Sequence, residues 1–235
     1  MNPHDSQIHS CWVAASTADS LTKPDNVGRV ARIDRPPPGE ELNLGEPTPA
    51  RLAATAILLR DGDDGPEVLL VQRNPEQRFM GGAWVFPGGA VHGDDADPPS
   101  AALRELEEEA GMRIEDVDEL VPFSRWITPE EVKTRFDTLF YVAAAPAGAE
   151  PRVDGAECVD ARWIRPADAL EAGRRGELML VFPTIKHLEQ LAEMSSVENA
   201  LEIARARQVE PILPKVVRGE GEAQVLLPGE PGYPG

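Results

Sequence analysis

A short apolar segment, a glycine-rich turn and a capped helix follow one another in this chain and constrain its fold most strongly. Trp84-Val85-Phe86 has the composition of a strand and stops at Pro87-Gly88-Gly89, because proline interrupts a regular ladder of hydrogen bonds. A helix is then expected to begin with Asp97 as its N-cap and Pro98 in its first position, and to end at Gly111. The segment therefore predicts a strand followed closely by a helix.

The rest of the central region alternates between strand-like and helix-like segments. Two apolar runs, residues 52–59 and 67–72, are separated by Asp and Gly residues and predict a hairpin. Three further strands are expected at 120–127, 138–144 and 159–163, and three further helices at 166–176, 183–194 and 197–208. Mixed elements with short links favour an α/β fold, in which a mixed β-sheet is sandwiched between helices.

The two ends of the chain differ in composition from its centre. Residues 1–47 include Pro36-Pro37-Pro38-Gly39 and show no sustained period, so we expect a largely irregular N-terminal arm. Residues 210–235 are rich in proline and glycine and are expected to form a tail without regular structure, although some of its residues are apolar enough to dock. One folded domain is expected between them, over residues 48–209.

The charge balance excludes several classes of partner. The chain has 23 Lys and Arg against 41 Asp and Glu, a net charge of −18, so it lacks a basic footprint for nucleic acid and would be repelled by an anionic membrane. Its longest apolar stretch is far shorter than the roughly 20 residues that span a bilayer. No secretion signal is evident, and Cys11 and Cys158 are too few for a disulfide framework. We expect a cytoplasmic globular protein.

Three carboxylates lie on one face of the helix described above. At about 100° per residue, Leu106 and Ala110 fall on the buried stripe, whereas Glu105, Glu108 and Glu109 fall on a different arc. Like charges at this spacing repel each other, and oxygen-rich clusters suit hard divalent cations such as Mg²⁺ or Mn²⁺. From the helix alone, a metal site and a solvated acidic face both remain open.

The surrounding sequence resembles a known family. Arg104-Glu105-Leu106-Glu107-Glu108-Glu109-Ala110-Gly111-Met112 fits REUxEExGU, the core of the Nudix box, where U is an apolar residue. The family's full box begins with Gly, five residues and Glu, then seven residues before the Arg. Here Gly89 is followed by five residues, Asp95 and eight residues before Arg104. The chain is therefore identified as similar to the Nudix hydrolase superfamily, with the role of Asp95 left open.

This resemblance implies a chemistry and a set of site residues. Nudix enzymes use Mg²⁺ or Mn²⁺ to hydrolyse a nucleoside diphosphate linked to another moiety. It implies metal binding by Glu105, Glu108, Glu109 and the Gly88 carbonyl, catalytic roles for Glu105, Glu108 and Glu157, substrate binding by Gly89, and structural roles for Arg104 and Gly111. Glu157, in a later loop, could bind metal, act as a base or be an exposed acid.

A second pattern lies directly upstream of the box. The segment from Leu69 to Gly89 resembles the coenzyme A diphosphatase signature LLTxR, Ser or Ala, x3-R-x3-G-x3-FPGG, with Val71 for Thr and Asn74 for Ser or Ala. It implies that Arg73 and Arg78 contact phosphate, a use that suits the forked guanidinium. Salt bridges at the strand end are the alternative for both arginines.

A third similarity covers most of the chain. Arg125-Trp126-Ile127-Thr128-Pro129, Arg135-Phe136-Asp137-Thr138, Trp163 and Phe182-Pro183-Thr184 resemble the peroxisomal Nudix-19-like branch, which includes coenzyme A diphosphatases. The aromatic residues Trp126, Phe136 and Trp163 are expected in the core rather than as platforms on which a base stacks.

Three functional hypotheses follow. The first is a hydrolase of coenzyme A or acyl-coenzyme A that gives adenosine 3′,5′-bisphosphate and 4′-phosphopantetheine. The second is an enzyme for another nucleoside diphosphate derivative, such as ADP-ribose, NADH or a dinucleoside polyphosphate. The third is a non-catalytic nucleotide-sensing Nudix domain, which would usually lack box glutamates that are all present here. Nudix enzymes are often dimers, so a homodimer is compatible with each hypothesis.

Overall fold

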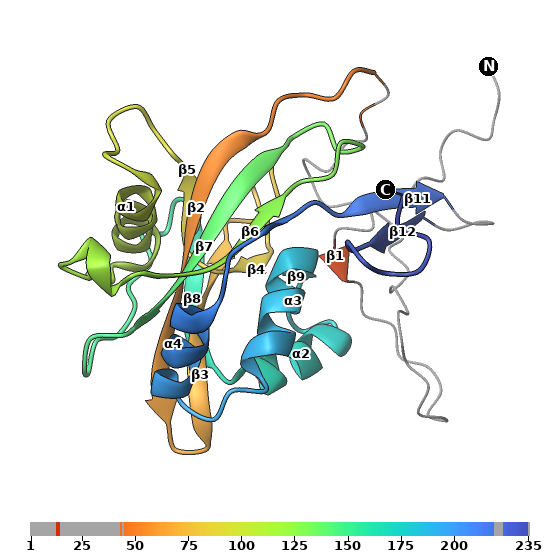
Figure 1. Ribbon diagram of the computed structural model, residues 1–235. Helices are drawn as coiled ribbons and strands as arrows, with labels where there is room; N and C mark the ends of the chain where they lie inside the picture. The colour runs from red at the N-terminus through yellow and green to blue at the C-terminus, as the bar shows by residue number, and fades with distance from the viewer. Residues whose placement is uncertain (1–12, 15–42, 44, 219–222, 235) are drawn as a thin grey trace.

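The computed structural model describes residues 13–14, 43, 45–218 and 223–234, and a mixed ten-stranded sheet forms its centre (Figure 1). The strands β2 (Arg51–Gly62) and β7 (Phe136–Ala144) run parallel, and β3 (Gly65–Arg73) and β6 (Val121–Ile127) pair antiparallel with their outer edges. The other strands of this sheet are β1 (Val13–Ala14), β4 (Trp84–Val85), β5 (Gly88–Ala90), β8 (Cys158–Ile164), β9 (Leu180–Val181) and β10 (Pro211–Ile212). The predicted hairpin and the three predicted later strands are confirmed.

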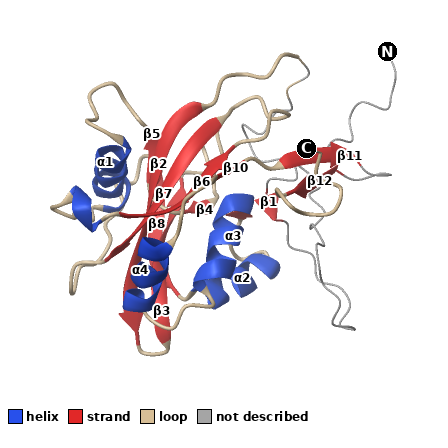
Figure 2. Ribbon diagram, viewed as in Figure 1, coloured by secondary structure: helices blue, strands red, loops and turns tan. Residues whose placement is uncertain are grey.

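Helices cover both faces of the sheet, as Figure 2 shows. They are α1 (Pro98–Ala110), the short η1 (Val117–Glu119), α2 (Pro166–Arg174), α3 (Phe182–Leu191) and α4 (Val197–Ala206). On β2, Ala56 and Leu58 pack in the cluster that contains α1, whereas Ile57 and Leu59 pack in the cluster that contains α2, α3 and α4. Because both faces are covered, residues 53–59 form a continuous buried run. The predicted α/β sandwich is confirmed.

Helix α1 begins and ends at the predicted caps. The Asp97 carboxylate accepts hydrogen bonds from the backbone N (2.9 Å) and the Oγ (2.6 Å) of Ser100. Gly111 adopts a left-handed φ of 61°, and a Cβ at this position would lie 2.9 Å from the carbonyl oxygen of Arg152. The two caps fix where the helix starts and stops, and therefore which way its glutamates point.

The prediction that residues 210–235 contain no regular structure is wrong. After β10, the strands β11 (Lys215–Arg218) and β12 (Ala223–Leu226) form an antiparallel pair. Pro214 directly precedes the first of these strands and Pro228 lies two residues after the second, so neither proline interrupts a ladder. The overall composition of the tail therefore concealed two short apolar segments that can pair.

This C-terminal pair of strands packs against the main body. Val225 is buried in a cluster with Met80 and Val181. Lys215 Nζ also donates a hydrogen bond to Glu130 Oε2 at 3.0 Å. The tail thereby contacts two separate loops of the domain.

A buried histidine joins α3 to the sheet. His187 is fully buried, with Nδ1 2.6 Å from the Pro183 carbonyl oxygen and Nε2 2.6 Å from Ser124 Oγ. Because a carbonyl can only accept, Nδ1 carries the proton and Nε2 accepts from the hydroxyl. Burial lowers the pKa of His187 to about 3, and the neutral ring packs 4.2 Å from the Phe140 ring centroid. This contact forms part of the support behind the cleft described next.

Two further expectations concern the N-terminal arm and membranes. Within the arm expected over residues 1–47, Val13–Ala14 form β1, whereas Cys11 and Pro36-Pro37-Pro38-Gly39 lie outside the described residues. No helix in the described ranges is long and apolar enough to cross a membrane.

Candidate active site

A cleft of about 690 Å³ opens between α1, β5 and the neighbouring ends of β2 and β7. The sequence-predicted site residues that line it are Arg73, Arg78, Gly88, Gly89, Arg104, Glu105, Glu108, Glu109 and Glu157. Gly111 is not among the lining residues, since it caps the far end of α1. The fold therefore brings together predicted site residues from two strands, one helix and two loops.

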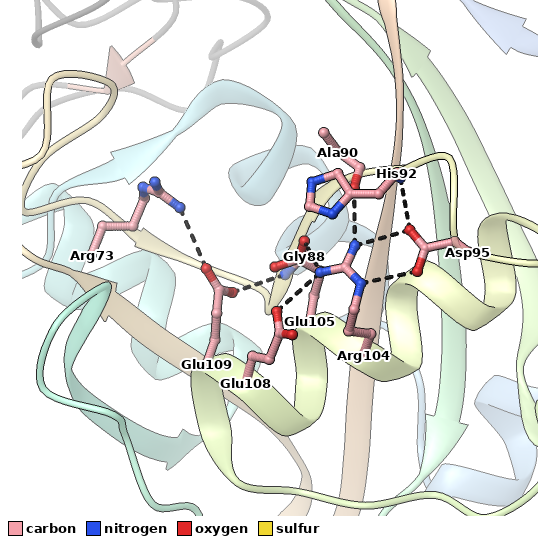
Figure 3. A network of polar contacts seen from close by, with 9 residues as sticks. All are labelled: Arg73, Gly88, Ala90, His92, Asp95, Arg104, Glu105, Glu108 and Glu109. Carbon is pink, nitrogen blue, oxygen red and sulfur yellow. Dashed lines mark hydrogen bonds and ion pairs between the residues drawn. The ribbon is translucent and has the colours of Figure 1, made fainter.

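Arg104 is the centre of a polar network (Figure 3). Its Nε and Nη2 contact the two carboxylate oxygens of Asp95 at 2.9 and 3.0 Å, and Nη2 also donates to the Ala90 carbonyl oxygen at 3.1 Å. Its Nη1 lies 2.8 Å from Glu105 Oε1 and 3.0 Å from Glu108 Oε2. One guanidinium thus ties the helix to β5 and to the loop that precedes the helix.

Asp95, whose role the sequence left open, is the forked partner of Arg104. The hydrogen bond from Arg104 lowers the pKa of Asp95 to about 2, and the His92 backbone N donates to the same carboxylate at 2.7 Å. The shorter Asp side chain still reaches the guanidinium, although eight residues rather than seven separate Asp95 from Arg104. The departure from the box pattern therefore leaves this ion pair intact.

Two of the three box glutamates are buried. Glu109 accepts a hydrogen bond from the Gly88 backbone N at 3.0 Å and lies 3.5 Å from Arg73 Nη1. Burial raises the pKa of Glu109 to about 7, although Gly88 and Arg73 favour its charged form. Burial also raises the pKa of Glu105, whereas 59% of the Glu108 side chain is exposed. A positive charge would therefore be favourable beside these carboxylates, at this end of the cleft.

The two glycines of β5 are required by close approach. A Cβ at Gly89 would overlap the Glu105 carboxylate, and a Cβ at Gly88 would overlap Thr55 Oγ1 on the paired strand β2. Glycine alone lets the backbone lie this close to both the helix and the strand. The buried carboxylates consequently lie directly against the backbone of β5, a strand that pairs with β2 where the sequence predicted a turn.

Glu157 is exposed on a loop at the edge of the cleft. The Asp154 carboxylate accepts a hydrogen bond from the Glu157 backbone N at 3.0 Å, and the Glu157 carbonyl oxygen accepts one from the Asn74 backbone N at 2.8 Å. The Asn74 side chain also donates to the Ala156 carbonyl oxygen at 2.9 Å. Asn74, which departs from the upstream signature, therefore anchors this acidic loop.

Comparison with known proteins matches residues 49–181 to the NUDIX domain. The chain belongs to the Nudix family. It is 25% identical over 232 residues to a putative nudix hydrolase 7 of Caenorhabditis elegans, a match that covers 81% of this chain and 77% of the relative. It is 47% identical over 53 residues to the Nudix hydrolase NudL of Klebsiella aerogenes, but this covers only 23% and 44% of the two chains.

Solved structures agree with this assignment. A NUDIX hydrolase from Alicyclobacillus acidocaldarius superposes with a TM-score of 0.60 and 29% identity, over 66% of this chain and 96% of that one. The NUDIX domain of Shewanella oneidensis NrtR, solved with ADP-ribose, shares the fold with a TM-score of 0.51 and 23% identity, over 62% and 88%. The chain is thus a Nudix pyrophosphohydrolase, an enzyme class that acts on nucleoside diphosphate derivatives.

Nudix hydrolases use divalent metal ions, and the donor set of this Nudix box fits such an ion. Among the described residues, no three His, Cys, Asp or Glu side chains are grouped as a formed metal site. Arg104 engages Glu105 and Glu108, while Glu109 accepts a hydrogen bond from the Gly88 backbone N. The oxygens of two carboxylates nevertheless lie within 3.0 Å of one cationic nitrogen, an arrangement that suits a hard cation.

Sequence reasoning missed the opposite end of the cleft. Arg51 and Phe79 line it, together with Phe136, which was expected in the core but is only partly buried. Trp126 also lines the cleft, and its burial in the core agrees with the expected position. The alternation of residues 51, 53 and 55 along one strand face was the available signal. Trp163 does not line the cleft and packs instead beside α1, in agreement with the expected core position.

The raised pKa of Glu109 predicts a pH-dependent stability in metal-free protein. Between the ordinary value of 4.5 and the folded value of about 7, the folded state keeps a proton that the unfolded state has lost. The wild type should therefore lose stability as pH rises through this window. Glu109→Gln removes this titration and should be more stable than the wild type at pH 8, by up to roughly 3 kcal/mol. Chemical denaturation in EDTA at several pH values measures both effects, and parallel pH profiles would contradict the prediction.

Proposed function

We propose that this Nudix hydrolase cleaves the pyrophosphate bond of coenzyme A or acyl-coenzyme A, giving adenosine 3′,5′-bisphosphate and 4′-phosphopantetheine or its acyl thioester. The observation that carries the reaction type is the arrangement of Glu105, Glu108 and Glu109 beside Gly88-Gly89 in one cleft. Phosphoryl transfer needs positioned charge more than covalent chemistry, and carboxylates that bind metal next to arginines supply it.

The metal would be Mg²⁺ or Mn²⁺, held by Glu105, Glu108, Glu109 and the Gly88 carbonyl oxygen. Carboxylate and carbonyl oxygens are the ligands that these hard cations prefer. When bound, the ion neutralises charge on the diphosphate and makes its phosphorus more open to attack by water. In this proposal Arg104 has a structural role, because its contacts to Asp95 and to the Ala90 carbonyl oxygen hold the helix against β5.

The attacking water would be oriented or deprotonated by one of the cleft carboxylates, Glu105, Glu108 or Glu157. Two observations support Glu157. Its backbone is held by hydrogen bonds to Asn74 and Asp154, and within the described ranges no donor contacts its carboxylate. A positioned carboxylate with unoccupied oxygens, on the open side of the cleft, suits a general base or a further metal ligand.

The choice of coenzyme A rests on the resemblance of the segment from Leu69 to Gly89 to the coenzyme A diphosphatase signature. In support, Arg73 and Arg78 both line the cleft. Arg78 is exposed and contacts no carboxylate among the residues described, so its guanidinium is available to a phosphate. We assign the backbone of Gly89, beside Glu105, to substrate binding as well.

Replacing one box glutamate should separate catalysis from folding. Glu108→Gln should lower kcat by at least about 100-fold, because the amide neither carries charge nor accepts a proton. The matched control is Glu107→Gln in the same helix, since Glu107 is 53% exposed, pairs with Arg113 at 3.2 Å and does not line the cleft. Steady-state kinetics on one substrate decide: equal losses of kcat in both variants, or full activity in both, would contradict the role assigned to Glu108. A wild type that binds nucleotides but cleaves no pyrophosphate would favour a non-catalytic nucleotide sensor.

Removing the metal should weaken substrate binding as well as turnover. The chain carries a net charge of −18. The glutamates at one end of the cleft would repel an anionic diphosphate unless a cation lay between them. Titration calorimetry with a slowly hydrolysed diphosphate, with and without EDTA, measures this. Unchanged affinity in EDTA would show that the arginines alone bind the substrate.

The substrate assignment can be tested with a panel of pyrophosphates. Coenzyme A, acetyl-coenzyme A, ADP-ribose, NADH and diadenosine polyphosphates are incubated with the enzyme and Mg²⁺ or Mn²⁺, and the products are identified by mass. We expect the highest kcat/KM for coenzyme A or its ester, with adenosine 3′,5′-bisphosphate as a product. Higher kcat/KM for ADP-ribose would overturn the substrate assignment and leave the reaction type standing.

A further inference from the structure

The side of the cleft away from the glutamates is built by two paired strands. On β2, Arg51, Ala53 and Thr55 point to one face, because side chains alternate along a strand. They lie opposite Phe136 and two further residues of β7, Thr138 and Phe140, in the parallel register. All six residues line the cleft. The floor of the cleft is therefore a regular two-strand surface rather than a loop.

This floor runs from the glutamates to a distinct far end. Thr55 pairs with Gly88, whose backbone N contacts Glu109, so it marks the metal end. Arg51 lies four residues further back along the same strand, about 13 Å away. Between them, Ala53 pairs with Thr138 in the register, and both side chains are small. The floor thus leaves room for an extended ligand between its two ends.

The far end combines a cation with aromatic rings. The Arg51 guanidinium lies 4.9 Å from the Phe136 ring centroid, and the Phe79 ring lies 5.6 Å from the same ring. Arg51 is exposed and contacts no carboxylate in the part of the chain that the structure describes. The acid next to Phe136, Asp137, is already engaged by Arg125 at 2.6 and 2.8 Å. The guanidinium of Arg51 is therefore left facing the cleft.

We propose that Arg51 selects nucleotides that carry an additional phosphate on the ribose, beyond the diphosphate that is cleaved. This inference rests on the proposed function, which puts the diphosphate beside the glutamates. A nucleoside extending from there along the floor brings its base to Phe136 and its ribose phosphate to Arg51. Guanidinium groups bind phosphate through paired, charge-assisted hydrogen bonds, and aromatic rings stack on bases. A nucleotide without the extra phosphate leaves Arg51 unused.

The chemistry at Arg51 suits a phosphate at either the 3′ or the 2′ position of the ribose. Coenzyme A carries the first and NADPH the second. Both phosphates are dianions on the same sugar. The experiment must therefore compare each phosphorylated nucleotide with the matching nucleotide that lacks the ribose phosphate. The predicted site thus recognises a phosphate group on the ribose. It would distinguish coenzyme A from ADP-ribose without any contact to the pantetheine arm.

The first test measures binding and does not depend on turnover. Adenosine 3′,5′-bisphosphate, adenosine 2′,5′-bisphosphate and 5′-AMP are titrated into the full-length protein in Mg²⁺ by calorimetry. We expect one of the bisphosphates to bind at least about tenfold more tightly than 5′-AMP, and Arg51→Ala to remove that difference. The matched control is Arg113→Ala, because Arg113 is 65% exposed and its ion pair among the described residues is with Glu107 on the surface, so this variant should retain the difference.

A second variant separates phosphate recognition from stacking. Phe136→Leu should weaken binding of 5′-AMP and both bisphosphates by a similar factor, because it removes the ring and keeps the guanidinium. The inference is overturned if the wild type binds all three ligands equally, or if Arg51→Ala weakens all three equally. The latter result would mean that Arg51 supports Phe136 rather than a ligand.

The kinetic test compares coenzyme A with dephospho-coenzyme A, and NADPH with NADH. Arg51→Ala should lower kcat/KM at least about tenfold for the phosphorylated member of the preferred pair, through KM, and much less for its partner. Failure of the wild type to cleave coenzyme A would reject the proposed substrate, whereas the binding titrations would still decide the role of Arg51. Cleavage of coenzyme A with equal losses for both members of each pair would reject only the role of Arg51.

Discussion

The site depends on one electrostatic constraint, which is that several carboxylates lie close together on one face of α1. Because these like charges repel one another, a cation among them is needed to stabilise the arrangement. In this structure Arg104 meets the constraint by contacting Asp95, Glu105 and Glu108 together. The ion pairs with one guanidinium offset the desolvation of these carboxylates, whereas a buried carboxylate without a partner would be strongly destabilising. Arg104 therefore links the helix, the strand β5 and the loop that holds Asp95.

The same constraint explains how so acidic a chain can bind an anion. The net charge of −18 repels a diphosphate at long range, whereas in our proposal the box glutamates attract divalent cations into the cleft. Arg73 and Arg78 line the same space, so with metal bound the local charge near the diphosphate opposes that of the whole molecule. In this proposal the acidic side chains thus concentrate divalent cations, and with them positive charge, in the cleft.

Local signals in the sequence predicted more than long-range ones. Asp97 and Gly111 act on backbone groups within a few residues, so the limits of α1 could be predicted from the sequence, and helical spacing then placed the glutamates on one face. Gly88 takes its place by pairing as β5 with β2, a register that the local sequence does not encode. Arg51 matters because Phe136 lies beside it, far along the chain. Strands β11 and β12 were missed because the prolines that flank them resemble breakers.

One strand, β2, serves both ends of the cleft, and this has a consequence for selectivity. Thr55 pairs with Gly88 near the glutamates, while Arg51 pairs with Phe136 at the far end. A slip of one residue in this register would turn Arg51 to the opposite face and displace the β5 pairing at once. The distance between the two ends is therefore set by backbone hydrogen bonds and not by mobile side chains. In our proposal, this fixed spacing lets Arg51 discriminate among nucleotides that share the same diphosphate. Only a phosphate at the matching distance from the bound diphosphate can contact its guanidinium.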